Sequence, residues 1–195
     1  MTTTSRCIVI LLALSVLFLS CPAARAADST GSTVTAGAPA KIDAMEHVQK
    51  YERAIHIMAM LLVGFGFLMV FVKRYGRSAL TATYLLVALS VPLYFMLNQY
   101  GVFGPAEKYD IDRLLMAEFA GASLLICAGA VLGRLRMWQY LVLGALFVPC
   151  YMANEWVMLK GGLGLLPAGK FLDTGGSIVI HAFGALFGLG AIFSL

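Results

Sequence analysis

Five ionisable side chains lie inside or at the edges of long apolar stretches of this sequence: His56, Glu118, Glu155, Asp173 and His181. Charged and titratable groups are expensive in an apolar setting, and inside a membrane they mark pathways for ions, protons or small polar molecules. A neutral imidazole donates from one ring nitrogen and accepts at the other, so His181 suits the passage of ammonia or water. His181 is therefore the first candidate for a pore-lining residue.

Asp173 begins the stretch Asp173-Thr-Gly-Gly-Ser, which leads into a long apolar run. We expect its carboxylate to accept backbone N–H groups at a helix start, where the helix dipole favours an acid. His181 follows eight residues later, about 80° around a continuous helix, so the two side chains are expected to share a face. The Asp-Thr-Gly triplet also occurs in aspartic proteases, but those need a second such loop. No catalytic partner stands at a usable spacing, so we expect no enzyme.

The other three ionisable residues leave alternatives open. His56 lies at interface depth in the first apolar run, where packing and headgroup contacts both suit it. Glu118 is compatible with capping a helix, pairing with Arg113 or facing an outer vestibule. Glu155, beside Asn154, is equally suited to a hydrogen bond with a neighbouring helix and to contact with a cation in the vestibule.

The elements that must position these residues are transmembrane helices. Hydrophobic residues make up 61% of the 195 residues and charged residues 12%, with a mean hydropathy of +0.87. A backbone in lipid must satisfy its own hydrogen bonds, which favours helices. Five apolar runs are each near the ~20 residues that cross a bilayer: 54–72, 79–97, 114–132, 138–159 and 177–195. The sequence therefore predicts an all-α, multi-pass membrane protein, and the plasma membrane is the expected location.

The first 53 residues differ from the rest. Residues 1–26 combine Arg6, a short apolar run and Ala24-Arg25-Ala26, typical of a cleaved signal peptide, although an uncleaved extra helix is the alternative. Residues 27–53 are polar without a clear apolar period and are expected to form a non-cytoplasmic tail. Basic residues in two short connections favour the same orientation: Lys73, Arg74, Arg77, Arg134 and Arg136.

Composition excludes several other functions. The 14 Lys and Arg residues are scattered and do not alternate with aromatic residues, so no nucleic-acid partner is expected. The four cysteines show no metal-ligand spacing, and neither a metal site nor a cofactor follows from them. Two pairs of glycines four residues apart, Gly129/Gly133 and Gly184/Gly188, favour close helix packing.

The segment Asp173 to Leu189, DTGGSIVIHAFGALFGL, resembles the pattern Asp-x-Gly-Gly-Ser, Ile-His-x-Phe-Gly-Ala and Phe-Gly-Leu of Rhesus-type members of the ammonium transporter family. Three shorter stretches are similar to the first, third and fourth spans of that family: Val63-Gly-Phe-Gly-Phe-Leu-Met with Lys73-Arg-Tyr-Gly, Ala130-Val-Leu-Gly, and Asn154-Glu155. The resemblance covers nearly everything from about Tyr51 onward.

This resemblance implies specific roles for several residues. His181 matches the first of two pore histidines, Asp173 the acid that shapes the outer mouth, and Phe119 the phenylalanine that gates the outer entrance. The family strips a proton from ammonium and passes ammonia along the histidines, and it works as a homotrimer with one pore per subunit. Its bacterial branch recruits ammonium with a tryptophan where this chain has Met158, with Trp156 two positions away, so the Rhesus branch is favoured.

The family builds each pore from two inverted five-helix halves, and this sequence matches the first half. We therefore expect an ammonium channel of which this chain is a fragment. The alternative is a non-conducting, Rhesus-like subunit or scaffold without a complete pore.

Overall fold

The computed structural model describes residues 39–67, 71, 76–105, 107–164, 167 and 171–194. The signal segment expected at 1–26 lies outside these residues. All regular elements in the described part of the chain are helical, which confirms the all-α prediction. The main elements are α2 (Pro39–Ala59), η1 (Met60–Phe67), α4 (Gly76–Gln99), α5 (Asp110–Ala130), α6 (Met137–Met158), η3 (Thr174–Gly176), η4 (Ser177–Ala182) and α7 (Phe183–Ser194), and a short turn η2 (Gly162–Gly164) lies between α6 and η3.

Four helices in the described residues are long and apolar enough to cross a membrane. They correspond to the second to fifth expected spans and comprise 76–99, 110–130, 137–159 and 174–194. The first expected span, 54–72, is described as the end of α2 continuing into the π-helical η1, up to Phe67. Its complete crossing stays a prediction.

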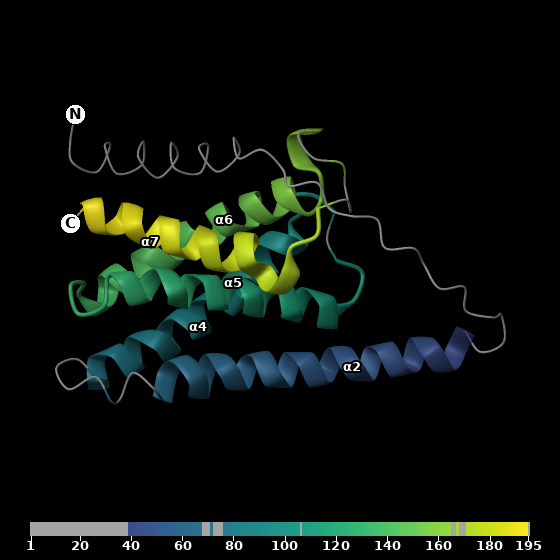
Figure 1. Ribbon diagram of the computed structural model, residues 1–195, viewed down its shortest axis with the longest axis horizontal. Helices are drawn as coiled ribbons and strands as arrows, with labels where there is room; N and C mark the ends of the chain where they lie inside the picture. The colour runs from purple at the N-terminus through teal and green to yellow at the C-terminus, as the bar shows by residue number, and fades with distance from the viewer. Residues whose placement is uncertain are drawn as a thin grey trace.

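Helix α2 begins at Pro39, well inside the segment expected to be a tail without a helical pattern. Residues 39–53 are helical instead of lacking a helical period, and Figure 1 shows α2 projecting beyond the rest of the bundle. The non-cytoplasmic location of this segment stays a prediction. An exposed apolar stripe at helical spacing runs along α2: Met45, Val48, Tyr51 and Ile55. Because polar residues separate these positions in the sequence, the segment as a whole is polar and its apolar spacing was not recognised.

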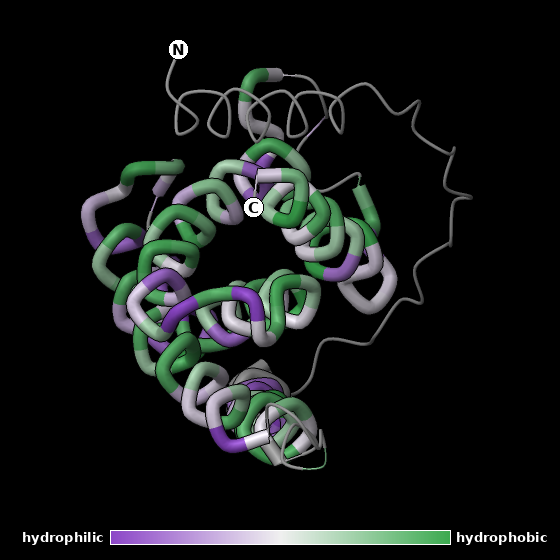
Figure 2. The backbone as a smooth tube through the Cα atoms, turned by 90° about the vertical axis from the view of Figure 1, so that its left-hand side faces the viewer, coloured by the Kyte–Doolittle hydropathy of each residue, from purple (hydrophilic) through white to green (hydrophobic). Residues whose placement is uncertain are grey.

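Helix α5 is the centre of the bundle and contacts α2, α4, α6 and α7. Figure 2, a view along the bundle, shows the helices side by side with apolar residues on most of their turns. A Cβ added to Gly184 would lie 2.5 Å from the carbonyl oxygen of Ser123, and one on Gly188 would lie 2.9 Å from the Ala130 Cβ. Close packing through this glycine pair is thus confirmed.

The other glycine pair behaves differently. A Cβ on Gly129 would meet no atom of the described residues within 4 Å, and Gly133 has a positive φ of 73° in the turn after α5. Gly133 therefore serves the turn, where a left-handed backbone favours glycine, and close helix packing at this pair stays a prediction.

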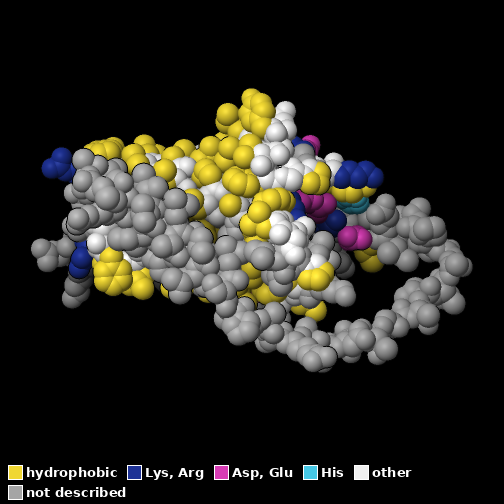
Figure 3. Space-filling view, turned by 90° about the horizontal axis from the view of Figure 1, so that it is seen from above, with side chains coloured by type: hydrophobic (Ala, Val, Ile, Leu, Met, Phe, Trp, Pro, Cys, Tyr) yellow, Lys and Arg dark blue, Asp and Glu magenta, His cyan; other side chains and the backbone are white. Residues whose placement is uncertain are grey.

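The connection between α4 and α5 and the first turn of α5 carry Glu107, Asp110 and Asp112. We call this the acidic end of the bundle. Figure 3 shows acidic side chains gathered at one end and hydrophobic side chains along the body. The turn between α5 and α6, with Arg134 and Arg136, lies at the opposite end of these two helices. Charge at the ends and apolar residues between them are the distribution expected for a membrane-spanning bundle.

Candidate functional site

The last span opens with a tight turn instead of a continuous helix. Gly175 and Gly176 have positive φ angles of 66° and 69°, and the turn folds Asp173 back over the helix start. The Asp173 carboxylate accepts the N–H of Ile178 at 3.0 Å and of Val179 at 2.8 Å. The expected helix-capping role of Asp173 is therefore confirmed.

The same turn overturns one geometric expectation. Asp173 and His181 do not share the face of one continuous helix, because the two left-handed glycines break the helix between them. Both carboxylate oxygens of Asp173 are occupied by backbone N–H groups. In this structure Asp173 shapes the start of the last span.

The first turns of the last span are a π-helix, η4, and side chains from two other helices bind its backbone. The Ser123 hydroxyl, on α5, donates to the carbonyl of Ile180 at 2.8 Å. The Asn154 amide, on α6, donates to the carbonyl of Val179 at 3.5 Å. The two peptide carbonyls that immediately precede His181 are therefore held from both sides.

His181 itself points away from the bundle and is exposed. None of the described residues forms a hydrogen bond or ion pair with its imidazole. The exposed positions Ala185, Leu189 and Phe193 follow it at intervals of four residues along α7. These four residues, called the His181 stripe below, form an apolar strip with one titratable group near the acidic end.

Phe119 is half-buried on α5 and packs against the core. It lies four residues before Ser123 and thus on the same side of the helix. Because Ser123 contacts the backbone just before His181, this side of α5 is the one that meets the opening of the last span. Phe119 therefore lies on the same face of α5 as the residue that contacts η4, and its role as a gate stays a prediction.

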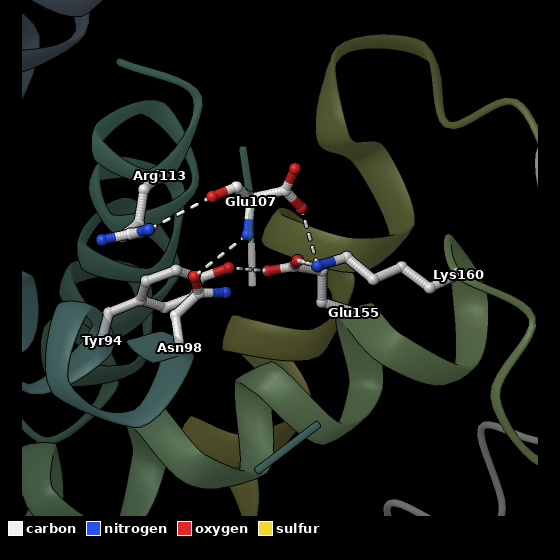
Figure 4. A network of polar contacts seen from close by, with 6 residues as sticks. All are labelled: Tyr94, Asn98, Glu107, Arg113, Glu155 and Lys160. Atoms are coloured by element: carbon white, nitrogen blue, oxygen red, sulfur yellow. Dashed lines mark hydrogen bonds and ion pairs between the residues drawn. The ribbon is translucent and has the colours of Figure 1, made fainter. Parts of the chain in front are cut away.

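A second polar cluster, the carboxylate clasp, consists of Tyr94, Glu107, Glu155 and Lys160 (Figure 4). The Tyr94 hydroxyl donates to Glu155 Oε2 at 2.8 Å, and both side chains are buried. Lys160 Nζ lies 2.8 Å from Glu107 Oε1 and 3.6 Å from Glu155 Oε1. The hydrogen bond of Glu155 to a neighbouring helix is confirmed, and the positive group beside it is Lys160. Contact of Glu155 with a cation in the vestibule stays a prediction.

Further bonds anchor this clasp to the α4–α5 connection. The Glu107 N–H donates to Asn98 Oδ1 at 3.4 Å, and its carbonyl accepts from the Arg113 guanidinium at 3.1 Å. Burial lowers the pKa of Lys160, but its contacts with Glu107 and Glu155 outweigh this and raise the pKa above the usual value of 10.5. Lys160 is therefore a permanent cation at neutral pH.

The remaining ionisable candidates, Glu118 and His56, form no hydrogen bond or ion pair with another helix among the described residues. Glu118 is only 1% exposed, and its Oε2 has no hydrogen-bond partner in the described structure. Arg113 pairs with Asp110 at 3.3 Å, so the expected pairing with Glu118 is not formed. His56 donates from Nδ1 to the carbonyl of Glu52 at 2.7 Å, one turn earlier in its own helix.

Three residues of these two polar regions were not expected from the sequence: Tyr94, Lys160 and Ser123. Ser123 and Tyr94 each place a polar group inside an apolar run of the sequence. Such a group needs a hydrogen-bond partner in a membrane, and this requirement could have identified both residues. Trp156 was not expected to recruit ammonium, because it lies two positions from the site of the bacterial tryptophan. Its ring packs closely over Gly162 and Gly104, where an added Cβ would lie 2.4 and 3.1 Å from the ring. The indole is thus a packing element of the acidic end.

Comparison with known proteins agrees with this architecture. The model of the Ammonium Transporter Family matches residues 13–195. The chain is 36% identical over 152 residues to ammonium transporter Rh type C of Homo sapiens, which covers 74% of this chain and 29% of the relative. It is 35% identical over 158 residues to ammonium transporter Rh type A of Rattus norvegicus, which covers 79% of this chain and 32% of the relative.

A solved structure is also similar. Rh50 of Nitrosomonas europaea, from the Rhesus protein family of channels, superposes with a TM-score of 0.74 at 52% sequence identity, covering 78% of this chain and 40% of that chain. The chain spans about a third of the length of the curated relatives. From its fold, its span-forming helices and the match over residues 13–195, the chain is a multi-pass membrane protein that belongs to the ammonium transporter family.

Proposed function

We propose that this chain forms the first part of an ammonium channel in which His181 lines the path of ammonia. The observation that carries the proposal is the state of His181: it is exposed on a span-forming helix, without a bonded partner among the described residues, while the polar groups around it are occupied. A titratable group left free at this depth is costly unless it serves a passing molecule. Membership of the family supplies the substrate class.

The chemistry follows from the cost of moving a charge through an apolar path. Ammonium must give its proton to water on the entry side before ammonia enters an apolar passage, since an isolated charge there is strongly disfavoured. Neutral ammonia both donates and accepts hydrogen bonds, and the His181 imidazole can match it with one nitrogen of each kind. Phe119 is proposed to guard the entrance, because an aromatic face attracts a cation and excludes bulk water.

We further propose that a longer product completes the pore. The chain spans 40% of the Rh50 structure that it resembles, and the His181 stripe is exposed in this segment. A second, inverted half would cover this stripe and form the other wall of the passage. The complete protein is proposed to assemble as a homotrimer in the plasma membrane, with its N-terminal tail and acidic end on the non-cytoplasmic side.

Uptake of labelled methylammonium by cells that lack their own ammonium transporters tests this proposal. Cells expressing the complete gene product should take up the tracer, and His181→Ala should reduce the initial rate by at least about tenfold at equal surface expression. His56→Ala is the matched control, because His56 bonds within its own helix. Equal uptake with and without the protein, despite normal insertion, would support the non-conducting alternative.

A further inference from the structure

We propose that Ser123 is the positioning residue of His181: its hydroxyl fixes the peptide group through which α5 sets the place of the imidazole. The proposal rests on the proposed function of His181, and it concerns how the structure prepares that residue. It assigns a role to a serine on a different helix, far from His181 in the sequence.

The contact acts on the peptide group that joins Ile180 to His181. Ser123 is 0% exposed, and its Oγ lies 2.8 Å from the carbonyl oxygen of Ile180. A peptide unit is planar, so the orientation of the Ile180 carbonyl also sets the N and Cα positions of the next residue, His181. A shift of this carbonyl therefore moves the imidazole with it.

The local helix geometry makes an external donor valuable here. Residues 177–182 form a π-helix, and the N–H of Phe183 is shared between the carbonyls of Ile178 and Ile180. This is the point at which the wide π turn changes to the α-helix α7, and such a change leaves carbonyls with weaker partners inside the helix. The hydroxyl of Ser123 gives the Ile180 carbonyl a second, short bond. The Asn154 bond to the preceding carbonyl is longer, at 3.5 Å.

Packing holds the donor in place. A Cβ built on Gly184 would lie 2.5 Å from the Ser123 carbonyl oxygen and 3.0 Å from its Oγ. Gly184 lies four residues after Ile180 and therefore on the same side of the helix. The two helices thus touch at the peptide before His181 and at the following turn, while the imidazole is on the exposed side.

Ser90 provides a matched control on α4. It is also 0% exposed, but its hydroxyl bonds to the carbonyl of Val87 within the same helix, at 3.3 Å. Ser90→Ala therefore removes an equally buried hydroxyl without touching the last span. Ser123→Ala removes the bond to Ile180, and Ser123→Cys keeps a side chain of similar size with a weaker donor.

The first readout is the NMR signal of His181 in lipid nanodiscs, using the complete gene product with isotope-labelled histidine. The histidine signal that disappears in His181→Gln is assigned to His181. We expect Ser123→Ala to shift or broaden the imidazole signals, Ser123→Cys to do so less, and Ser90→Ala to leave them unchanged. Unchanged His181 signals in a folded Ser123→Ala chain would overturn the proposal.

The second readout is methylammonium uptake by the complete gene product. The maximal rate should fall roughly fivefold in Ser123→Ala, which corresponds to the loss of one ordinary hydrogen bond, with little change in the half-saturating concentration. Ser123→Cys should recover part of the rate, and a full rate in Ser123→Ala would contradict the proposal. If the NMR signals shift but His181→Ala transports normally, the transport role of His181 fails while the positioning role of Ser123 holds.

Discussion

Two polar regions near the acidic end of the bundle use their hydrogen bonds in opposite ways. In the carboxylate clasp, ionisable side chains bond to one another: Tyr94 and Lys160 both contact Glu155, and Lys160 also contacts Glu107. At the opening of the last span, polar side chains bond to backbone groups. The imidazole beside them, His181, is left exposed.

We propose that this difference separates polar groups that stabilise the fold from polar groups that meet a substrate. Glu155 and His181 are both titratable and both lie near the start or end of a span. Glu155 is 2% exposed and its charge is compensated within the chain. Removing one partner of a compensated, buried pair leaves an unpaired charge that destabilises the fold, whereas we propose that an exposed group without a partner among the described residues is available for a substrate.

The largest effect is expected at the contact that seats the last span on α5. Gly184→Ala places a methyl group 2.5 Å from a backbone oxygen, so α7 must move, and we expect a loss of about 3 kcal/mol in the free energy of unfolding. Unfolding in mixed detergent micelles measures it. Gly129→Ala is the control: the added methyl group meets no atom within 4 Å in the part of the chain that the structure describes, and the substitution should stabilise α5 by up to about 1 kcal/mol. Equal effects of the two substitutions would refute the asymmetry between the glycine pairs.

The next effect is expected in the carboxylate clasp. Lys160→Met leaves Glu155 and Glu107 without their shared cation, and we expect a loss of about 2 kcal/mol in the free energy of unfolding, since a buried carboxylate loses its compensation. Lys108→Met is the control, because Lys108 is exposed and contacts the ring of Tyr109. A Lys160→Met protein as stable as the Lys108→Met protein would show that the clasp contributes nothing.

The pH dependence of this loss has a defined sign. The folded-state pKa of Lys160 is raised above 10.5, so its stabilising contribution is complete below the unfolded pKa and disappears as pH rises through the folded pKa. The cost of Lys160→Met should therefore be constant between about pH 6 and about pH 9 and should shrink only at higher pH. Unfolding titrations across this range check it, and a cost that vanishes near neutral pH would contradict the assignment.

A smaller effect is expected at the helix cap. Asp173→Ala removes the acceptor for two backbone N–H groups, and we expect a loss of about 1 kcal/mol in the free energy of unfolding. Asp173→Asn keeps one acceptor oxygen and should lose less. If Asp173→Ala left the protein stable but abolished methylammonium uptake, Asp173 would act on the substrate instead of on the helix.

Much of this architecture could be predicted from local sequence. The apolar runs gave the span-forming helices, and the position of Asp173 before an apolar helix gave its capping role. Prediction failed where the backbone departs from a continuous helix. Gly175 and Gly176 both adopt left-handed conformations, which removed the expected common face of Asp173 and His181. A helical wheel assumes uniform geometry and does not represent such a break.

The clasp and the Ser123 contact could not be predicted for a different reason. They join residues from different helices, and their partners depend on which helix faces meet. Tyr94 and Glu155 are 61 positions apart, and Ser123 and Ile180 are 57 apart. The sequence indicated that each polar group needs a partner, but only the three-dimensional packing selects which one.

The most direct test of the account compares His181→Ala with Glu155→Gln in the complete gene product. Initial methylammonium uptake is measured per folded protein, alongside the free energy of unfolding. The account predicts that His181→Ala loses transport with unchanged stability, and that Glu155→Gln loses stability while each folded molecule transports normally. The reverse pattern, with transport lost in Glu155→Gln and retained in His181→Ala, would contradict it.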